Sequence, residues 1–195
     1  MTSALLEIID VGCEREGRTL FSQLNLVVQP GQCIELSGPN GSGKSTLLRC
    51  INGLFPDFEG TIEVADMLYM GHKAGVNPLL TALENLRWYQ VITDSHGSAH
   101  SALEKVGLAG YEDVRCQYLS AGQQRRVALA RLLICRAPLW LLDEPFTALD
   151  DAGQALVREL LAAHCEHHGG VVCATHQSLG LAEVVPLRLG GVAPR

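Results

Sequence analysis

A glycine-rich segment near the start of the chain carries the residues with the clearest chemistry. It reads GPNGSGKST and fits the pattern G-x-x-x-x-G-K-[ST], which is typical of a phosphate-binding P-loop. Its glycines let backbone N–H groups turn toward phosphate oxygens, and the helix expected to follow directs its positive end at the same anion. Lys44 is expected to reach the β- and γ-phosphates, and the Ser45 hydroxyl to bind Mg²⁺. The residues expected to bind the nucleotide are Gly38, Pro39, Asn40, Gly41, Ser42, Gly43, Lys44, Ser45 and Thr46.

Two adjacent carboxylates form a second candidate set. The very apolar run Leu139–Leu142 ends directly in Asp143 and Glu144. A buried parallel strand would deliver both residues to the carboxyl edge of a sheet, where ligands of such folds bind. We expect Asp143 to hold Mg²⁺ through water and Glu144 to polarise an attacking water. Taken alone, the pair is most simply a strand end capped by solvated acids, and the P-loop upstream favours the catalytic interpretation.

The segment Leu119–Gln123 opens a long predicted helix. Ser120 and Gln123 have the S-x-x-Q spacing of a capping box, which explains the pair on local grounds alone. The segment also resembles the signature motif of ABC ATPases, with Ala121 in place of the usual first glycine. This resemblance implies that Ser120, Ala121, Gly122 and Gln123 approach the γ-phosphate of ATP held by a second copy of the chain.

Further ABC elements follow in the family's order. Asp150, in Ala148–Asp150, has the place of the D-loop aspartate, and His176 matches the switch histidine that contacts the γ-phosphate and helps to fix the water. The resemblance therefore implies ATP as the nucleotide and a catalytic role for His176 beside Glu144. Outside this series, a lone histidine after a strand is more often a neutral surface residue.

Two positions depart from the ABC pattern. The family's Q-loop glutamine is expected at this point of the chain, where the sequence has His72 and Lys73 instead. Signalling between the helical part of the fold and the nucleotide site is therefore expected to differ from that in the family. The aromatic residue that stacks on adenine is absent near Arg15 and Glu16. The guanidinium of Arg15 or Arg18 could stack on the base instead.

Longer segments narrow the resemblance to one group of ABC ATPases. Three segments are similar to the haem-exporter ATPases of bacterial cytochrome c maturation, namely Gly71–Val76, Leu80–Leu86 and Leu119–Asp150. This similarity implies a homodimer that couples ATP hydrolysis to haem export or to release of a haem-loaded chaperone. It also implies a peripheral subunit on the cytoplasmic face of the bacterial inner membrane, bound to integral permease subunits of the cytochrome c maturation B and C types. The alternatives are the ATPase of another small ABC exporter and, less in keeping with the sequence, a soluble ABC ATPase.

The elements that must position these residues alternate between short apolar runs and longer helical patterns. This alternation predicts an α/β fold. The resemblance to ABC ATPases implies that it is a P-loop NTPase fold of the ABC type, with an N-terminal antiparallel β region. We expect a single domain over residues 1–195, with a helical lobe at about 73–135 inserted in the core. The expected strands are Leu5–Ile9, Leu24–Val28, Cys33–Ser37, Thr61–Val64, Met67–Met70, Leu139–Leu142 and Val171–Ala174, and the expected helices are Lys44–Asn52, Thr81–Ile92, Ser101–Val106, Ser120–Cys135 and Ala152–His168.

Composition excludes several other classes. The net charge of -6 supplies no basic face for nucleic acid, so nucleic acid is not an expected partner. No apolar run approaches the roughly 20 residues of a membrane span, so membrane contact is expected only through partners. The seven cysteines form no C-x-x-C pair and are expected to be reduced. The run from His164 to His168 could ligate a metal or haem, but a polar helix end is the more ordinary interpretation.

Overall fold

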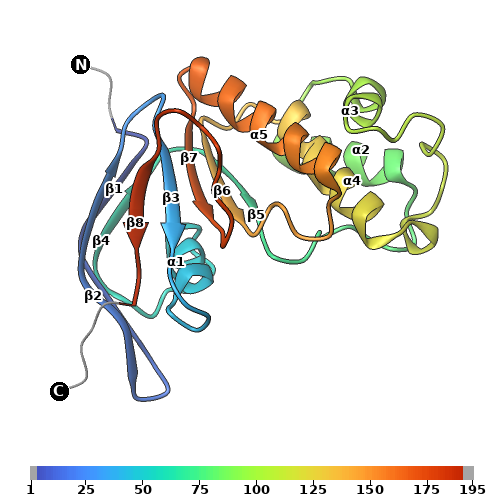
Figure 1. The fold of residues 1–195 in the computed structure, drawn as a ribbon. Helices are drawn as coiled ribbons and strands as arrows, with labels where there is room; N and C mark the ends of the chain where they lie inside the picture. Colours follow the sequence, from blue (N-terminus) through green and yellow to red (C-terminus); the bar gives the residue numbers. More distant parts are fainter. Residues whose placement is uncertain (1–3, 191–195) are drawn as a thin grey trace. The chain divides into compact units, whose positions relative to one another are not determined.

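The computed structural model describes residues 4–190, which form two compact units (Figure 1). Unit 1 takes the residues up to Tyr69, the segment Ala137–Pro145 and the residues from Leu161 onward. Unit 2 takes Met70–Arg136 and Phe146–Leu160. The P-loop and both predicted catalytic residues belong to unit 1, whereas the signature and D-loop segments belong to unit 2.

An antiparallel sheet forms the first part of unit 1. Its strands are β1 (Leu6–Arg15), β2 (Arg18–Val28) and β4 (Glu59–Val64), in the order β2-β1-β4. Glu16 and Gly17, with φ of 54° and 75°, make the two-residue turn between β1 and β2. Two positive φ values in succession suit the twist of a tight hairpin. The predicted N-terminal antiparallel region is confirmed.

A second sheet has the strand order β5-β6-β7-β3-β8, and β3, β6, β7 and β8 run parallel. Strands β6 and β7 are buried throughout, so their sequences are continuous apolar runs rather than alternating ones. The bounds are β3 (Cys33–Ser37), β5 (Met67–Met70), β6 (Leu139–Asp143), β7 (Gly170–Ala174) and β8 (Val185–Arg188).

The hydrophobic core of unit 1 joins both sheets to helix α1 (Lys44–Ile51). Leu47 and Leu48 of α1 are fully buried in one cluster with Ile8 of β1, Leu36 of β3 and Leu141 of β6. Because α1 begins directly after the P-loop, this packing fixes the loop at the carboxyl end of β3.

Unit 2 is mainly helical within the described residues. It contains α2 (Ala82–Thr93), α3 (Ala99–Lys105), α4 (Ala121–Ile134) and the first part of α5 (Asp151–Glu166), with a short 3₁₀ turn at Cys116–Tyr118. Helices α2 and α4 both begin in capping boxes, at Thr81 and Ser120. The predicted fold class, an α/β P-loop NTPase with a helical lobe, is confirmed.

Three local features differ from the predictions. Strand β8 was not predicted, because Val185–Arg188 is short, largely exposed and contains a proline, as edge strands often do. Strands β1 and β2 are longer than expected, since register shifts near Asp10 and Gln23 keep them paired where the apolar alternation breaks. Helix α3 begins at Ala99, two residues before the predicted start at Ser101, because the Ser98 side chain caps it.

Candidate active site

The P-loop connects β3 to α1, and its glycines adopt conformations that other residues avoid. Gly38, Gly41 and Gly43 have φ of 145°, 76° and 98°. A Cβ at Gly38 would collide with the Leu189 carbonyl, whereas a Cβ at Gly41 would meet no atom within 4 Å. The glycines therefore leave the backbone N–H groups of the loop uncovered by side chains, as phosphate binding requires.

Lys44 lies within this cradle. Its ammonium group donates hydrogen bonds to the carbonyl oxygens of Gly38 (2.7 Å) and Pro39 (3.2 Å), and the residue is 8% exposed. The buried hydroxyl oxygen of Ser42 has no hydrogen-bond partner among the described residues. A buried polar atom without a partner is costly, and a phosphate oxygen in the loop would supply one. The predicted nucleotide-binding residues thus fit a phosphate chain.

The predicted acid pair ends β6 as expected. Asp143 is 2% exposed and is paired with Ala174 at the end of β7. The Glu144 amide donates to the Ala174 carbonyl (2.8 Å), and Glu144 has a φ of 52° immediately before Pro145. A left-handed conformation at a residue other than glycine costs about 1–3 kcal/mol and is concentrated at functional sites. The backbone therefore holds Glu144 in a conformation that an ordinary strand end would not adopt.

His176 lies next to Glu144. Its Nε2 atom is 3.5 Å from Glu144 Oε1, with the histidine side chain 50% exposed and the glutamate 19%. Thr175 positions it, because the Thr175 amide donates to Leu36 O of β3 (3.2 Å) and its hydroxyl accepts from the Gln177 amide (3.0 Å). The structure brings together the two residues predicted to be catalytic, 32 positions apart in sequence (176 minus 144).

The start of α4 has the predicted capping box. Ser120 Oγ accepts from the Gln123 amide (3.2 Å), and the Ser120 amide donates to Gln123 Oε1 (2.9 Å). Ser120 and Ala121 are exposed. A Cβ at Gly122 would lie 2.8 Å from the Ala148 carbonyl oxygen, so this glycine lets the D-loop approach the helix. The helix start is thus well formed and accessible, as contact with a second copy would need.

Asp150 joins the D-loop to α4. Its Oδ1 atom accepts from the Gly153 amide (3.0 Å) and from Arg126 Nη2 (2.7 Å). The Gly153 N–H and the Arg126 guanidinium together lower the pKa of this carboxyl group. Asp150 therefore caps α5 and links it to α4, a structural role that the sequence did not suggest.

The oxygen donors suit Mg²⁺ better than a softer metal. The Ser45 hydroxyl and the Asp143 carboxylate are hard oxygen ligands, which Mg²⁺ prefers. Residues 4–190 contain no group of three or more His, Cys, Asp or Glu side chains that could hold a metal. A bound Mg²⁺ would therefore complete its shell with phosphate oxygens and water, as it commonly does.

The segment that replaces the expected Q-loop is held by two arginines of α4. Arg125 Nη1 donates to the carbonyls of Gly71 (3.1 Å) and His72 (3.3 Å), and Arg131 donates to those of Ala74 and Gly75. The Arg131 guanidinium also lies 5.1 Å from the centre of the Tyr89 ring. Burial raises the pKa of Tyr89 to about 12 and lowers the pKa of Arg131. Neither arginine was predicted from the sequence to bind this segment.

The position of the expected adenine-stacking aromatic lies at the β1–β2 turn. Arg15 and Arg18 face each other across the hairpin, and Arg15 Nε is 3.6 Å from Glu16 Oε1. Stacking of either guanidinium on a base stays a prediction.

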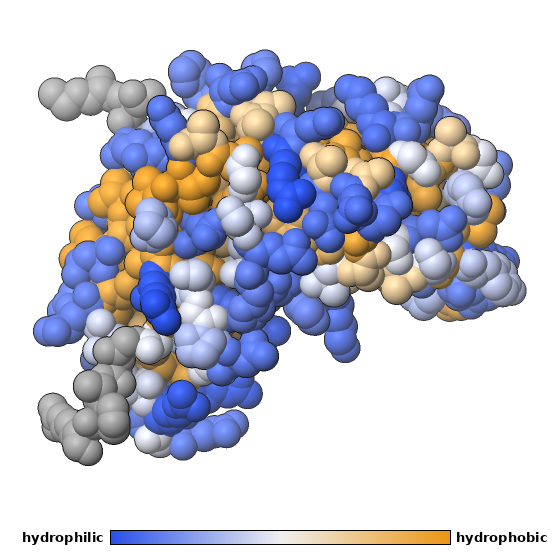
Figure 2. Space-filling view, in the orientation of Figure 1, coloured by the Kyte–Doolittle hydropathy of each residue, from blue (hydrophilic) through white to orange (hydrophobic). Residues whose placement is uncertain are grey.

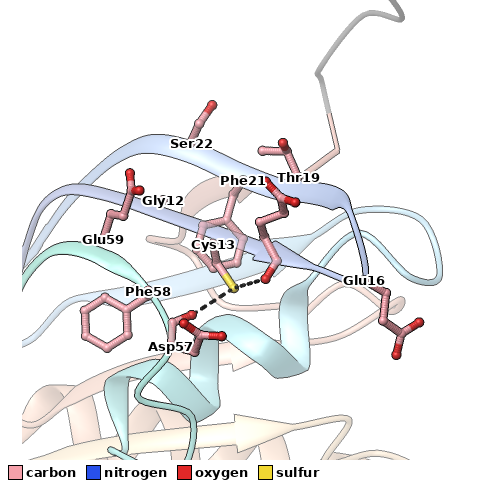
Figure 3. Close-up of a pocket in the computed structure, with 10 residues that line it drawn as sticks. Gly12, Cys13, Glu16, Thr19, Phe21, Ser22, Asp57, Phe58 and Glu59 are labelled. Atoms are coloured by element: carbon pink, nitrogen blue, oxygen red, sulfur yellow. Dashed lines mark hydrogen bonds between the residues drawn. The ribbon is translucent and has the colours of Figure 1, made fainter.

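A cavity of about 510 Å³ lies on the same sheet (Figure 3). Its lining includes Cys13, Phe21 and Phe58 together with four acidic side chains, which are Glu14, Glu16, Asp57 and Glu59. Because these carboxylates would repel a phosphate chain, we do not assign the cavity to the nucleotide.

The histidine-rich end of α5 is ordinary in structure. His164 stacks on Trp140 at 3.7 Å between ring centres and 7° between ring planes, and burial lowers its pKa. His167 Nδ1 lies 2.7 Å from the Ala163 carbonyl oxygen. Two of the three histidines thus have local packing or hydrogen-bonding roles. All seven cysteines are free thiols.

Comparison with known proteins decides the family. A family model described as "ABC transporter" matches residues 21–147. Proteins named cytochrome c biogenesis ATP-binding export protein CcmA are 47% identical in Pseudomonas fluorescens and 44% in Escherichia coli O157:H7, each over 92% of both chains. The protein of that name from Hahella chejuensis is 46% identical over 97% of both chains. The chain belongs to the CcmA family of ABC transporter ATPases.

Solved structures agree with this family. A dimeric ATP-binding cassette bound to ADP and Pi in a post-hydrolysis state has a TM-score of 0.82 and 25% identity, over 94% of this chain and 96% of that one. An ATP-binding protein from Pyrococcus furiosus, with a TM-score of 0.83 and 23% identity over 96% of this chain and 98% of that one, supports the fold alone. As a member of the CcmA family, the chain is an ATP-binding ABC ATPase, which confirms the predicted enzyme class. The roles of its individual residues remain predictions.

Proposed function

We propose that this CcmA-family chain is the ATP-hydrolysing subunit of an ABC-type membrane complex for c-type cytochrome biogenesis. Hydrolysis would drive haem export or the release of a haem-loaded chaperone. The observation that carries the hydrolytic part is the contact of Glu144 Oε1 with His176 Nε2 at 3.5 Å. The biological process rests on relatives of up to 48% identity that carry the CcmA name.

The functional residues of unit 1 would have separate roles in ATP binding and hydrolysis. The P-loop backbone and Lys44 hold the phosphates, and Lys44 would exchange its bonds to the Gly38 and Pro39 carbonyls for phosphate oxygens. Glu144 accepts a hydrogen bond from the attacking water, and His176 holds the γ-phosphate and that water in line. Mg²⁺, bound at Ser45 and through water at Asp143, would neutralise charge on the β- and γ-phosphates.

The exposed start of α4 supports a composite site. Ser120 and Ala121 are exposed at an N-terminal helix end, which attracts anions. We propose that Ser120, Ala121, Gly122 and Gln123 contact ATP bound by the P-loop of a second copy. The similar cassette that was solved as a dimer with ADP and Pi supports this arrangement.

The proposal of membrane partners rests on the family and on the surface of unit 2. No helix in residues 4–190 has the length and apolar character needed to cross a bilayer. Leu79, Trp88, Val91 and Ile92 of unit 2 are 56–82% exposed, and Figure 2 shows hydrophobic residues at the surface among many hydrophilic ones. We propose that the chain is peripheral on the cytoplasmic face of the inner membrane. Its partners would be permease subunits of the cytochrome c maturation B and C types.

Complementation tests this proposal. In a bacterium lacking its own CcmA-family ATPase, the wild-type chain should restore covalently haem-stained c-type cytochromes, and Glu144→Gln should not. The tagged wild-type chain should also co-purify with integral membrane proteins in detergent. Hydrolysis of ATP without restored cytochromes would favour another small ABC exporter. Full activity without any membrane partner would favour an ABC ATPase that acts free of membranes.

A further inference from the structure

The connection from β7 to β8 carries His176 and has no helix. In the parallel sheet β3 lies between β7 and β8, so residues 175–184 must cross β3 to reach β8 (Figure 1). A connection without regular structure leaves its backbone amides without helical partners. Its conformation therefore depends on contacts with the strand beneath it.

Two hydrogen bonds to β3 hold this connection on either side of His176. The Thr175 amide donates to the Leu36 carbonyl (3.2 Å), and the Leu179 amide donates to the carboxylate oxygen Oε2 of Glu35 (3.1 Å). The Leu179 side chain is fully buried, which anchors the same point by packing. His176 thus lies in a short span with both ends attached to β3.

Glu35 is an unusual residue for its place. It lies inside β3, with Cys173 of β7 and Pro186 of β8 as its register partners. Its neighbours Ile34 and Leu36 join the hydrophobic core, so by strand alternation Glu35 points to the opposite face, where the connection runs. A charged residue is uncommon within a parallel strand that has partners on both sides. The hydrogen bond that its carboxylate accepts from the Leu179 amide spans 144 positions of the sequence.

We propose that Glu35 is a positioning residue for His176. The inference rests on the proposed catalytic role of His176, and Glu35 would act only through the backbone of the connection. A carboxylate that accepts from a backbone amide makes a strong, charge-assisted hydrogen bond. It fixes the backbone three residues after His176 and so holds the imidazole beside Glu144. Misplacement of a catalytic group by a fraction of an ångström to an ångström lowers turnover rather than ground-state binding.

The test compares Glu35→Leu, which removes the acceptor, with Glu35→Gln, whose amide oxygen can still accept from Leu179. Glu63→Leu is the matched control, because Glu63 is an exposed strand glutamate in β4. Two quantities are measured in the full chain: hydrogen exchange of amides 176–180, and ATP hydrolysis by the chain purified with its membrane partners. Glu144→Gln and His176→Ala are included to show that the measured turnover belongs to this site.

For Glu35→Leu we expect about tenfold faster hydrogen exchange at the Leu179 amide. We also expect about tenfold lower kcat, a change of ~1.4 kcal/mol in the activation free energy, with KM within about twofold of the wild-type value. Glu35→Gln should restore both quantities to near wild type, and Glu63→Leu should change neither. Unchanged exchange or unchanged kcat in Glu35→Leu overturns the inference, as does a KM effect equal to the kcat effect. If His176→Ala keeps full turnover, the proposed function of His176 fails instead, and the exchange result still reports on the contact itself.

Discussion

Replacing Gly122 by alanine separates two opposing effects at the start of α4. Alanine is a better helix former than glycine by about 1 kcal/mol, so without neighbours the change would stabilise the helix. The new Cβ, however, would lie 2.8 Å from the Ala148 carbonyl oxygen, a backbone atom. Ala148 has a φ of 64°, so the D-loop is already in an unfavourable conformation at this point.

We expect the steric cost of the new methyl group to exceed the gain in helix propensity. Forcing an extra methyl group into a close contact costs roughly 1–3 kcal/mol, and contact with backbone rather than a flexible side chain puts this site in the upper half of that range. After subtracting the helix-propensity gain of about 1 kcal/mol, we expect Gly122→Ala to lower the free energy of unfolding by about 1–2 kcal/mol.

Urea denaturation followed by circular dichroism measures this difference. Ala121→Gly is the matched control, since Ala121 is the exposed neighbour and its replacement should change stability by no more than about 1 kcal/mol. A Gly122→Ala chain as stable as wild type, or more stable, would refute the packing of the D-loop against the signature helix.

Two further predictions concern unit 1. Lys44→Ala should abolish ATP binding in a fluorescent-nucleotide titration, because the buried ammonium group is the cation of the phosphate cradle; retained micromolar affinity would contradict this. Burial lowers the pKa of His164, so the folded state favours neutral imidazole, and the stability that this contributes is present above the unfolded pKa of about 6.5 and is lost as pH falls below it. His164→Phe, which keeps the stack on Trp140, should therefore lose less stability than wild type in urea melts between about pH 7 and 5; identical losses would count against a buried neutral histidine.

Much of the chemistry was predictable because it is local in sequence. The P-loop, the end of β6 and the capping box at Ser120 each occupy fewer than ten consecutive residues. The sequence indicates the backbone conformation of each segment directly, through glycines in the P-loop, through a buried apolar run in β6 and through S-x-x-Q spacing at Ser120. The structure reproduces these segments where the sequence placed them.

The features that were missed depend on contacts between distant residues. The hydrogen bond from the Leu179 amide to Glu35 spans 144 positions, and those from Arg125 to Gly71 and from Arg131 to Gly75 span 54 and 56. None has a periodicity or spacing that a single sequence reveals. Strand β8 belongs with them, because its pairing with β3 rather than its own composition makes it a strand.

In the proposed mechanism two copies of this chain enclose ATP, with Glu144 as the catalytic carboxylate. Sedimentation of full-length Glu144→Gln with ATP and Mg²⁺ tests it most directly. We expect a dimer that retains ATP unhydrolysed and that returns to monomer when the nucleotide is removed. A Glu144→Gln chain that hydrolyses ATP at the wild-type rate, or that binds ATP while remaining monomeric, would contradict it.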